Sequence, residues 1–312
     1  MSQSLRQSYA RARYATSRNL NLFLAKRLGV PRVPAIRISR AVSIGMNPFP
    51  YVHRPELARR MGAAAGGAIA IESARACAAL APDRLAEIAP AVRQGMEVFR
   101  ESERTGALQR YDHGASRKEF LVYATQKRAT AQYLDIMRLA LARPVLDAVS
   151  RYLGAVPILS DVSVMVSLPN LSEIGSQLYH LDFADDRQVK LFVCIDEVTD
   201  EHGPFTFLPA NESERVVEAL QYDRGRLTIE DVQAFVGPGK EIMLIGAPGQ
   251  GMLVDTSRCL HYGSRQNSKT RIMLLIQYTD YYAPELNPAT WPVDRLVRDL
   301  GLDEVQRLAI TL

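Results

Sequence analysis

A series of short apolar runs in the C-terminal half of the chain, separated by turn residues, most constrains the fold. The expected strands are residues 161–168, 177–183, 189–198, 205–208, 241–245, 251–254 and 271–279. Many short strands with turn signals such as Gly203-Pro204 are typical of an antiparallel jelly roll, whereas a parallel α/β sheet would alternate strands with helices. We therefore predict a mainly β fold with a jelly-roll, cupin-like core.

Helical patterns flank and interrupt these strands. They cover residues 61–81, 83–103, 116–152, 211–221, 228–236 and 296–308. Residues 31–55 are rich in Pro and β-branched residues and predict an extended connection. The expected organisation is one integrated domain with a basic arm and extended linker (1–55), a helical annex (56–155) that buttresses the core, the β core (156–283) and a C-terminal helix (284–312).

The composition is that of an ordinary globular protein. The chain has 312 residues, of which 47% are hydrophobic and 23% charged. Cys77, Cys194 and Cys259 lack the spacing of zinc ribbons or redox motifs, so we expect reduced, packed thiols and a cytoplasmic location. No apolar run reaches the length needed to span a bilayer, so no transmembrane segment is expected.

Basic residues are concentrated at the N-terminus. Residues 1–55 hold ten Lys or Arg and no Asp or Glu, although the whole chain has a net charge of only +4. Residues 1–28 resemble an organellar transit peptide in composition, and the alternative is a helical arm that lies on the acidic remainder of the chain. The aromatic interleaving of a single-strand binder is missing, so no nucleic-acid partner is expected.

Two histidines and one aspartate form the candidate metal site. In His180-Leu181-Asp182 the first and third side chains share a face if the segment is extended, and His261 would join them from a distant strand. Two imidazoles and one carboxylate are the ligands of a facial-triad iron(II) site, which leaves positions open for a cosubstrate and dioxygen. The same side chains also suit a structural His–Asp hydrogen bond, or zinc and other divalent metals.

The segments around these residues resemble the phytanoyl-CoA dioxygenase family over about residues 156–282. The motifs concerned are His180-Leu181-Asp182, Lys190-Leu191-Phe192-Val193, Gly203-Pro204-Phe205, His261-Tyr262-Gly263-Ser264-Arg265-Gln266-Asn267 and Thr270-Arg271. The resemblance implies a double-stranded β-helix and an Fe(2+)- and 2-oxoglutarate-dependent dioxygenase that uses O2. It also implies that His180, Asp182 and His261 are the catalytic metal ligands and that Arg271 binds the distal carboxylate of 2-oxoglutarate.

The proposed role of Arg271 is chemically reasonable, because a guanidinium stays charged and its planar fork pairs bidentately with a carboxylate. Arg265 is the nearest rival, and we interpret it as part of the loop before the last strand. With these roles, the chain would oxidise an unactivated C–H bond of a small-molecule substrate, by hydroxylation as the default outcome, and release succinate and CO2.

Several alternatives stay open from the sequence. The same barrel could carry a non-oxidative metal-dependent hydrolase or isomerase, which would have no use for Arg271 as a dicarboxylate anchor. It could also bind a small acid as a sensor, without catalysis. Lys190 or Arg187 could meet an acidic substrate or the cosubstrate; the alternative is an Asp186-Arg187 surface turn with Lys190 in an edge-strand salt bridge. Gln177 and Tyr179 have no assigned role, and neither the substrate nor the oligomeric state follows from the sequence.

Overall fold

The large sheet forms the centre of the molecule. The computed structural model describes residues 3–64, 69–113, 116–237, 239–284 and 291–312. Within this described part, seven antiparallel strands form one sheet in the order β1-β8-β5-β10-β4-β3-β2. Their bounds are β1 (Cys77–Leu80), β2 (Gln109–His113), β3 (Ser116–Gln126), β4 (Ile158–Ser167), β5 (Gln188–Cys194), β8 (Gly251–Asp255) and β10 (Arg271–Thr279).

A smaller antiparallel sheet accompanies the large one. It contains β7 (Ile242–Met243), β6 (Thr206–Phe207) and β9 (His261–Tyr262), in that order. A cavity lies between the two sheets, because residues of β4, β5 and β10 line it together with His261 of β9. Two antiparallel sheets around an inner cavity, with helices outside, confirm the predicted mainly β, jelly-roll fold class.

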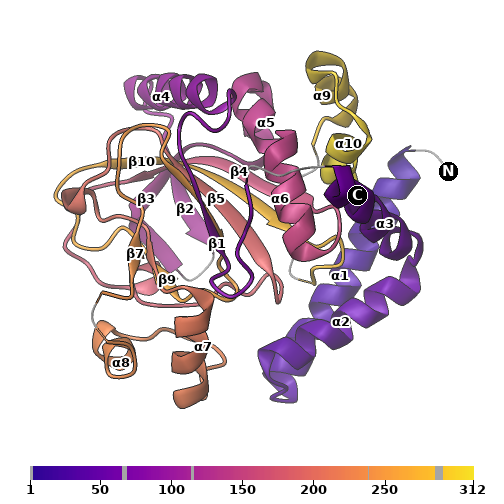
Figure 1. The fold of residues 1–312 in the computed structure, drawn as a ribbon, viewed down its shortest axis with the longest axis horizontal. Helices are drawn as coiled ribbons and strands as arrows, with labels where there is room; N and C mark the ends of the chain where they lie inside the picture. Colours follow the sequence, from indigo (N-terminus) through magenta and orange to yellow (C-terminus); the bar gives the residue numbers. More distant parts are fainter. Residues whose placement is uncertain (1–2, 65–68, 114–115, 238, 285–290) are drawn as a thin grey trace.

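The strands of the large sheet separate two environments. Along β4, the even-numbered Val162, Val164 and Val166 join the hydrophobic core, while Asp161 and Met165 line the cavity. This division follows from the period-two alternation of side chains in a strand. The core-facing residues pack with helices α4 (Ile88–Arg104), α5 (Leu134–Ala140) and α6 (Arg143–Leu153), which lie outside the sheet (Figure 1).

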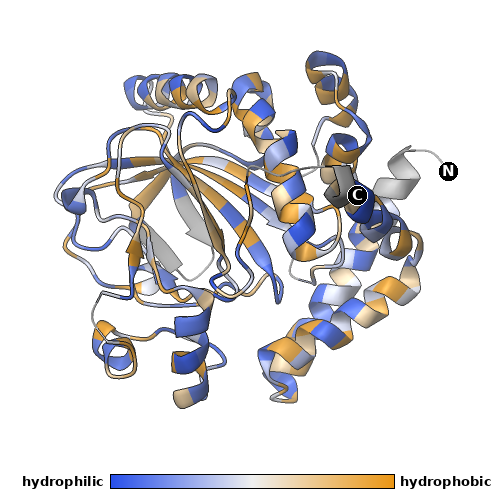
Figure 2. Cartoon of the chain, viewed as in Figure 1, coloured by the Kyte–Doolittle hydropathy of each residue, from blue (hydrophilic) through white to orange (hydrophobic). Residues whose placement is uncertain are grey.

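The remaining helices lie around this core. α7 (Ala210–Ala219) and α8 (Ile229–Gln233) lie beside the small sheet, and α9 (Val293–Leu300) and α10 (Glu304–Ile310) lie near the N-terminal helices (Figure 1). Figure 2 shows hydrophobic residues concentrated in the central strands and mixed with hydrophilic ones along the helices. The predicted helices at 83–103, 211–221 and 228–236 are thus confirmed with shifted ends, while the predicted closing helix is two helices separated at Gly301, which has a φ of 65°.

The prediction of an extended connection over residues 31–55 was wrong. The N-terminal region is helical: α1 (Gln3–Arg27), α2 (Arg32–Met46) and α3 (Phe49–Ala64). Pro31 is the N-cap of α2, and Pro34 and Pro50 lie in the first turns of α2 and α3. Prolines are tolerated there because the first N–H groups of a helix have no intrahelical acceptor.

Two further helix predictions were wrong. Residues 116–126, predicted as the start of a helix, form strand β3, which pairs with β4 from Leu121 to Gln126. Cys77–Leu80, within a predicted Ala-rich helix, form edge strand β1, which pairs with β8. Pairing with strands more than 30 residues away overrode the local pattern. Segment 56–155 therefore adds strands to the sheet, and the division of the chain at residues 55, 155 and 283 stays a prediction.

The segment 177–183, predicted as a strand, was also misassigned. It begins with a 3-10 turn, Gly175–Gln177, and continues with single bridges at Tyr179 and His180. Tyr179 pairs with Leu227 and His180 with His261, so its neighbours are a loop and the small sheet. The segment is extended, as the sequence suggested, yet it lacks the continuous ladder that defines a strand.

Arginines of the N-terminal helices dock them on the β core. Arg13 donates to Ser43 Oγ at 2.9 Å and stacks over the Tyr281 ring at 4.2 Å. Arg54 donates to the main-chain oxygens of Val156 and Leu308, at 3.0 and 2.8 Å. These contacts match the alternative of a helical arm lying on the rest of the chain. Every helix in the described ranges is too short or too polar to cross a membrane.

Candidate metal centre

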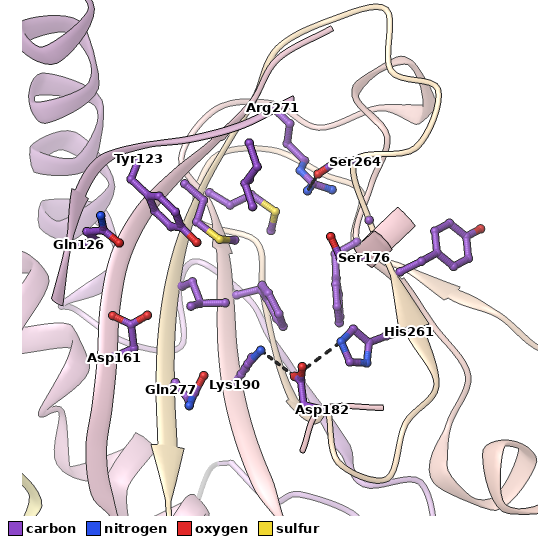
Figure 3. A pocket seen from close by; sticks show the side chains of 18 of the residues that line it. Tyr123, Gln126, Asp161, Ser176, Asp182, Lys190, His261, Ser264, Arg271 and Gln277 are labelled. Carbon is purple, nitrogen blue, oxygen red and sulfur yellow. Dashed lines mark hydrogen bonds and ion pairs between the residues drawn. The ribbon is translucent and has the colours of Figure 1, made fainter. Parts of the chain in front are cut away.

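Main-chain pairing brings the two predicted histidine ligands together. The N–H of His180 donates to His261 O at 3.1 Å, and the N–H of His261 donates to His180 O at 3.0 Å. Asp182 is held two residues further on, where its N–H donates to Thr256 O at 2.9 Å. One possible ligand atom from each of the three side chains lies within 4.8 Å of the other two. Figure 3 shows Asp182 and His261 on the cavity wall.

Both imidazoles present the same nitrogen to the centre of this cluster. His180 Nδ1 lies 2.9 Å from Leu178 O, and His261 Nδ1 lies 2.9 Å from Cys259 O. A carbonyl only accepts, so each Nδ1 carries the proton and each Nε2 has a free lone pair. Burial and the neighbouring imidazole lower the pKa of His180 well below its usual value, and burial lowers the pKa of His261 to about 4. Two neutral imidazoles are the form that binds a metal.

Asp182 is the anionic member of the cluster. Lys190 donates to Asp182 Oδ2 at 2.6 Å and Gln188 Nε2 donates to the same oxygen at 3.2 Å. Burial alone would raise the pKa of Asp182, but Lys190 and the two imidazoles outweigh it and lower this pKa below its usual value. In the described part of the chain Oδ1 accepts no side-chain hydrogen bond, so one carboxylate oxygen is available to an ion.

The N-terminal helices reach this centre through one arginine. Arg32, at the start of α2, donates to the main-chain oxygens of Asp182 (2.8 Å) and Ser257 (3.1 Å). Its own N–H donates to Asp223 Oδ1 at 2.6 Å. A residue from the segment predicted as a linker therefore fixes the backbone of a candidate ligand, a role that no motif in the sequence indicated.

Arg271 lines the same cavity from β10, at the end away from Asp182 (Figure 3), and is only 4% exposed. Its guanidinium donates to Gly203 O, to Ser167 Oγ at 3.1 Å and to Ser264 Oγ at 2.9 Å, while Nε has no hydrogen-bond partner in the described part of the chain. Burial lowers its pKa to about 10, and among the described residues no carboxylate balances its charge. A buried cation with only neutral acceptors is stabilised when an anion binds beside it.

The glycine that contacts Arg271 has no room for a side chain. Gly203 has a φ of +57°, and a Cβ at this position would lie 2.8 Å from Arg265 O and 3.0 Å from Asn267 Cβ. Its carbonyl accepts a hydrogen bond from Arg271, so the Gly203-Pro204 turn that signalled a strand boundary also orients the arginine.

The other polar residues named from the sequence lie outside the cavity. Arg265 donates from Nε to Gln177 O at 2.8 Å and stacks over Tyr262 at 4.1 Å, and Arg187 donates to Tyr152 O at 3.1 Å. Gln177 and Tyr179 are buried and contribute to other contacts. Lys190 is the exception: it lines the cavity from an inner strand, where it pairs with Asp182 and not with a neighbour at a sheet edge.

The cavity has a volume of about 390 Å³ and an apolar middle. Phe192, Phe205, Met165, Met273 and Leu275 line this middle. Sequence reasoning missed its polar members Ser264, Asp161 and Gln277. Alternation from Arg271 along the last strand would have found Gln277, since residues 271, 273, 275 and 277 share one face. Nothing local in the sequence indicated Asp161 or Ser264.

Comparisons with known proteins give weak likenesses only. No protein-family model matches the chain, and no curated protein matches its sequence. Among solved structures, EctD from S. alaskensis with bound Fe is 15% identical, with a TM-score of 0.48 over 77% of this chain and 82% of that one. SnoN, a non-heme alpha ketoglutarate dependent epimerase from nogalamycin biosynthesis, is 18% identical, with a TM-score of 0.44 over 72% of this chain and 84% of that one.

A third likeness is HygX from Streptomyces hygroscopicus with nickel and 2-oxoglutarate bound, which is 14% identical, with a TM-score of 0.40 over 66% of this chain and 84% of that one. Similarity at these values says nothing about which reaction this chain performs. The chemistry that the site can perform therefore has to be inferred from its own residues. Membership of the phytanoyl-CoA dioxygenase family stays a prediction.

Proposed function

We propose that the protein is an Fe(2+)- and 2-oxoglutarate-dependent oxygenase that acts on a small-molecule substrate, and that its two sheets form a double-stranded β-helix. The observation that carries the proposal is the combination of a His180, Asp182 and His261 cluster with a buried, anion-deficient Arg271 in one cavity. Either feature alone has a structural explanation. Together they provide a metal site and an anchor for a dicarboxylic acid in the same cavity.

The donor set fits a ferrous ion. Two neutral imidazoles with free Nε2 atoms and one ionised carboxylate match the facial triad of non-haem iron oxygenases, and three protein ligands leave positions open. When bound, the iron would couple the reduction of O2 to oxidative decarboxylation of 2-oxoglutarate, so that succinate and CO2 form and one oxygen atom passes to the substrate. Hydroxylation of a C–H bond is the default outcome.

The residues of the chain would position these reactants. Arg271, oriented by Ser167 and Ser264, would bind the distal carboxylate of 2-oxoglutarate with its planar fork. Lys190 would hold the Asp182 carboxylate, whose Oδ2 lies 3.6 Å from His261 Nε2, in place beside the two imidazoles. The apolar middle of the cavity would exclude water from the reacting carbon. A zinc hydrolase or isomerase would use the triad but leave the charge of Arg271 unbalanced.

Turnover of the cosubstrate tests the proposal. Purified protein supplied with Fe(2+), O2 and 2-oxoglutarate should form succinate, slowly without the substrate, and should stop without oxygen. Asp182→Ala should reduce the rate at least about 100-fold because an open-site metal cannot be held by two imidazoles alone. Asp83→Ala, at an exposed position outside the cavity, is the matched control and should match the wild type. Protein that binds the metal but neither binds nor consumes 2-oxoglutarate would contradict the proposal.

The location of the protein remains part of the proposal. Cys77, Cys194 and Cys259 are free and buried, which suits a reducing compartment such as the cytoplasm. Arg13 of α1 donates to Ser43 and stacks over Tyr281, so cleavage of a transit peptide at residue 28 would remove α1 and these buried contacts.

A further inference from the structure

A second polar group lines the cavity at the end away from Arg271. Gln277 lies six residues after Arg271 on β10, about 20 Å along an extended strand. It pairs with Lys190 on one neighbouring strand and with Asp161 on the other. Since Lys190 contacts Asp182, the row Lys190, Gln277 and Asp161 runs outward from the metal centre, as Figure 3 shows.

Asp161 has hydrogen-bonding capacity that the protein does not fill. Oδ2 accepts one long hydrogen bond, from Ser163 Oγ at 3.4 Å, and Oδ1 is covered from solvent without a partner in the described part of the chain. Burial raises the pKa of Asp161, although the charges of Lys127 and Lys190 and the nearby N–H groups of Val162 and Lys127 oppose this. Because Oδ1 is covered, an incoming donor would reach Asp161 at Oδ2, where the one hydrogen bond present is long and leaves acceptor capacity.

The neighbours of Asp161 add to this capacity. The side-chain amide of Gln277 lines the cavity and makes no hydrogen bond within the described residues. Gln126 on β3 also lines the cavity, but its Nε2 donates to Gln109 Oε1 at 2.9 Å. A bulge in the β10–β4 pairing lies next to Gln277, where register shifts between Gln277 and Tyr278. Bulges re-aim side chains and are frequent beside active sites. Neither the metal triad nor the anchor at Arg271 needs these groups.

We propose that Asp161 and Gln277 form a substrate subsite that binds a hydroxyl or amino group carried on an apolar body. The inference rests on the proposed function, because it takes the triad as the reaction centre and Arg271 as the cosubstrate anchor. The donor group hydrogen-bonds to Asp161, and Leu275, the next cavity-facing residue from Gln277 along β10, contacts the apolar body. A carboxylate at this end could not donate to Asp161 and would meet its charge, and the nearby Lys127 and Lys190 offset only part of that repulsion.

Three small probes of equal shape test the subsite: cyclohexanol, cyclohexylammonium and cyclohexanecarboxylate. Isothermal titration of protein loaded with Ni(2+) and 2-oxoglutarate should give at least about tenfold tighter binding of the alcohol and the ammonium than of the carboxylate. Asp161→Asn should lower the affinity for the ammonium about tenfold and spare the alcohol, whereas Asp161→Leu should weaken both. Asp83→Asn is the matched control and should bind all three as the wild type does.

The selectivity of the wild type needs no variant to fold, so it tests the inference independently. Equal affinity for the three probes, no binding of any of them, or unchanged binding in Asp161→Leu would overturn the subsite. The ammonium titration is repeated with metal-free protein. If the ammonium binds metal-free protein in an Asp161-dependent way and the protein never turns over 2-oxoglutarate, the oxygenase function is rejected and the subsite is kept. If 2-oxoglutarate is turned over but no Asp161-dependent binding is measured, the subsite is rejected and the oxygenase function is kept.

Discussion

Replacing Arg271 with methionine tests whether this arginine binds a ligand or only stabilises the fold. Burial lowers the pKa of Arg271 from 12.5 to about 10. At about 1.36 kcal/mol per pKa unit, this shift corresponds to a desolvation penalty of about 3 kcal/mol for the charged guanidinium at neutral pH. Methionine removes the charge and the penalty, and keeps most of the side chain's volume.

The same substitution also removes hydrogen bonds to Gly203 O, Ser167 Oγ and Ser264 Oγ. Each is donated by a charged group and contributes about 1.5 kcal/mol, so the loss exceeds the gain by about 1–2 kcal/mol. We expect the free energy of unfolding of the metal-free protein to fall by no more than about 2 kcal/mol. An arginine buried in a structural ion pair would instead lose about 3–5 kcal/mol on truncation.

The cosubstrate should respond differently. Loss of one partner of a buried charge pair costs about 2–5 kcal/mol in binding, so the Kd for 2-oxoglutarate in Arg271→Met should rise at least about 30-fold. Arg271→Lys, which keeps the charge without the fork, should lie between the two. Urea denaturation and titration of 2-oxoglutarate into Ni(2+)-loaded protein measure both effects. Large destabilisation with unchanged 2-oxoglutarate affinity would refute the reasoning.

Three further predictions follow from other contacts. Gly203→Ala should destabilise the protein by about 2 kcal/mol more than the control Gly106→Ala. Gly106 also has a positive φ, but a Cβ there would meet nothing within 4 Å. Equal losses of stability in urea titrations would contradict this prediction. Arg32→Met should cost about 2 kcal/mol and weaken Ni(2+) binding, whereas the exposed Arg37→Met should do neither; calorimetry checks both. Burial raises the pKa of Asp255 from 3.8 to about 6, so its protonation stabilises the folded state below pH 4, and about 3 kcal/mol is lost as the pH rises through 6. The two buried histidines have lowered pKa values, so their contribution to stability changes with pH in the opposite direction. The measurement is therefore the difference in the free energy of unfolding between wild type and Asp255→Asn, at pH 4.5 and at pH 7.5. The same difference at both pH values would count against the assignment.

The sequence by itself determined the β-rich core and the identity of the candidate ligands. Short apolar runs bounded by turn residues, over β4, β5, β8 and β10, indicate buried strands, and such a run is a local property of each segment. His180, Asp182, His261 and Arg271 were identifiable because few side chains bind metals or carboxylates, and their types carry that chemistry.

Only the tertiary structure decided how these residues meet. Residues 116–126 form strand β3, which pairs with β4. Helices α1, α2 and α3 dock on the core through buried arginines whose main-chain acceptors lie far along the chain. Asp161 became a candidate substrate ligand only when β4 was placed beside β10. Each outcome depends on contacts between residues that are distant in sequence. Local propensity reflects only neighbouring residues, so it does not indicate which distant segment a residue will contact.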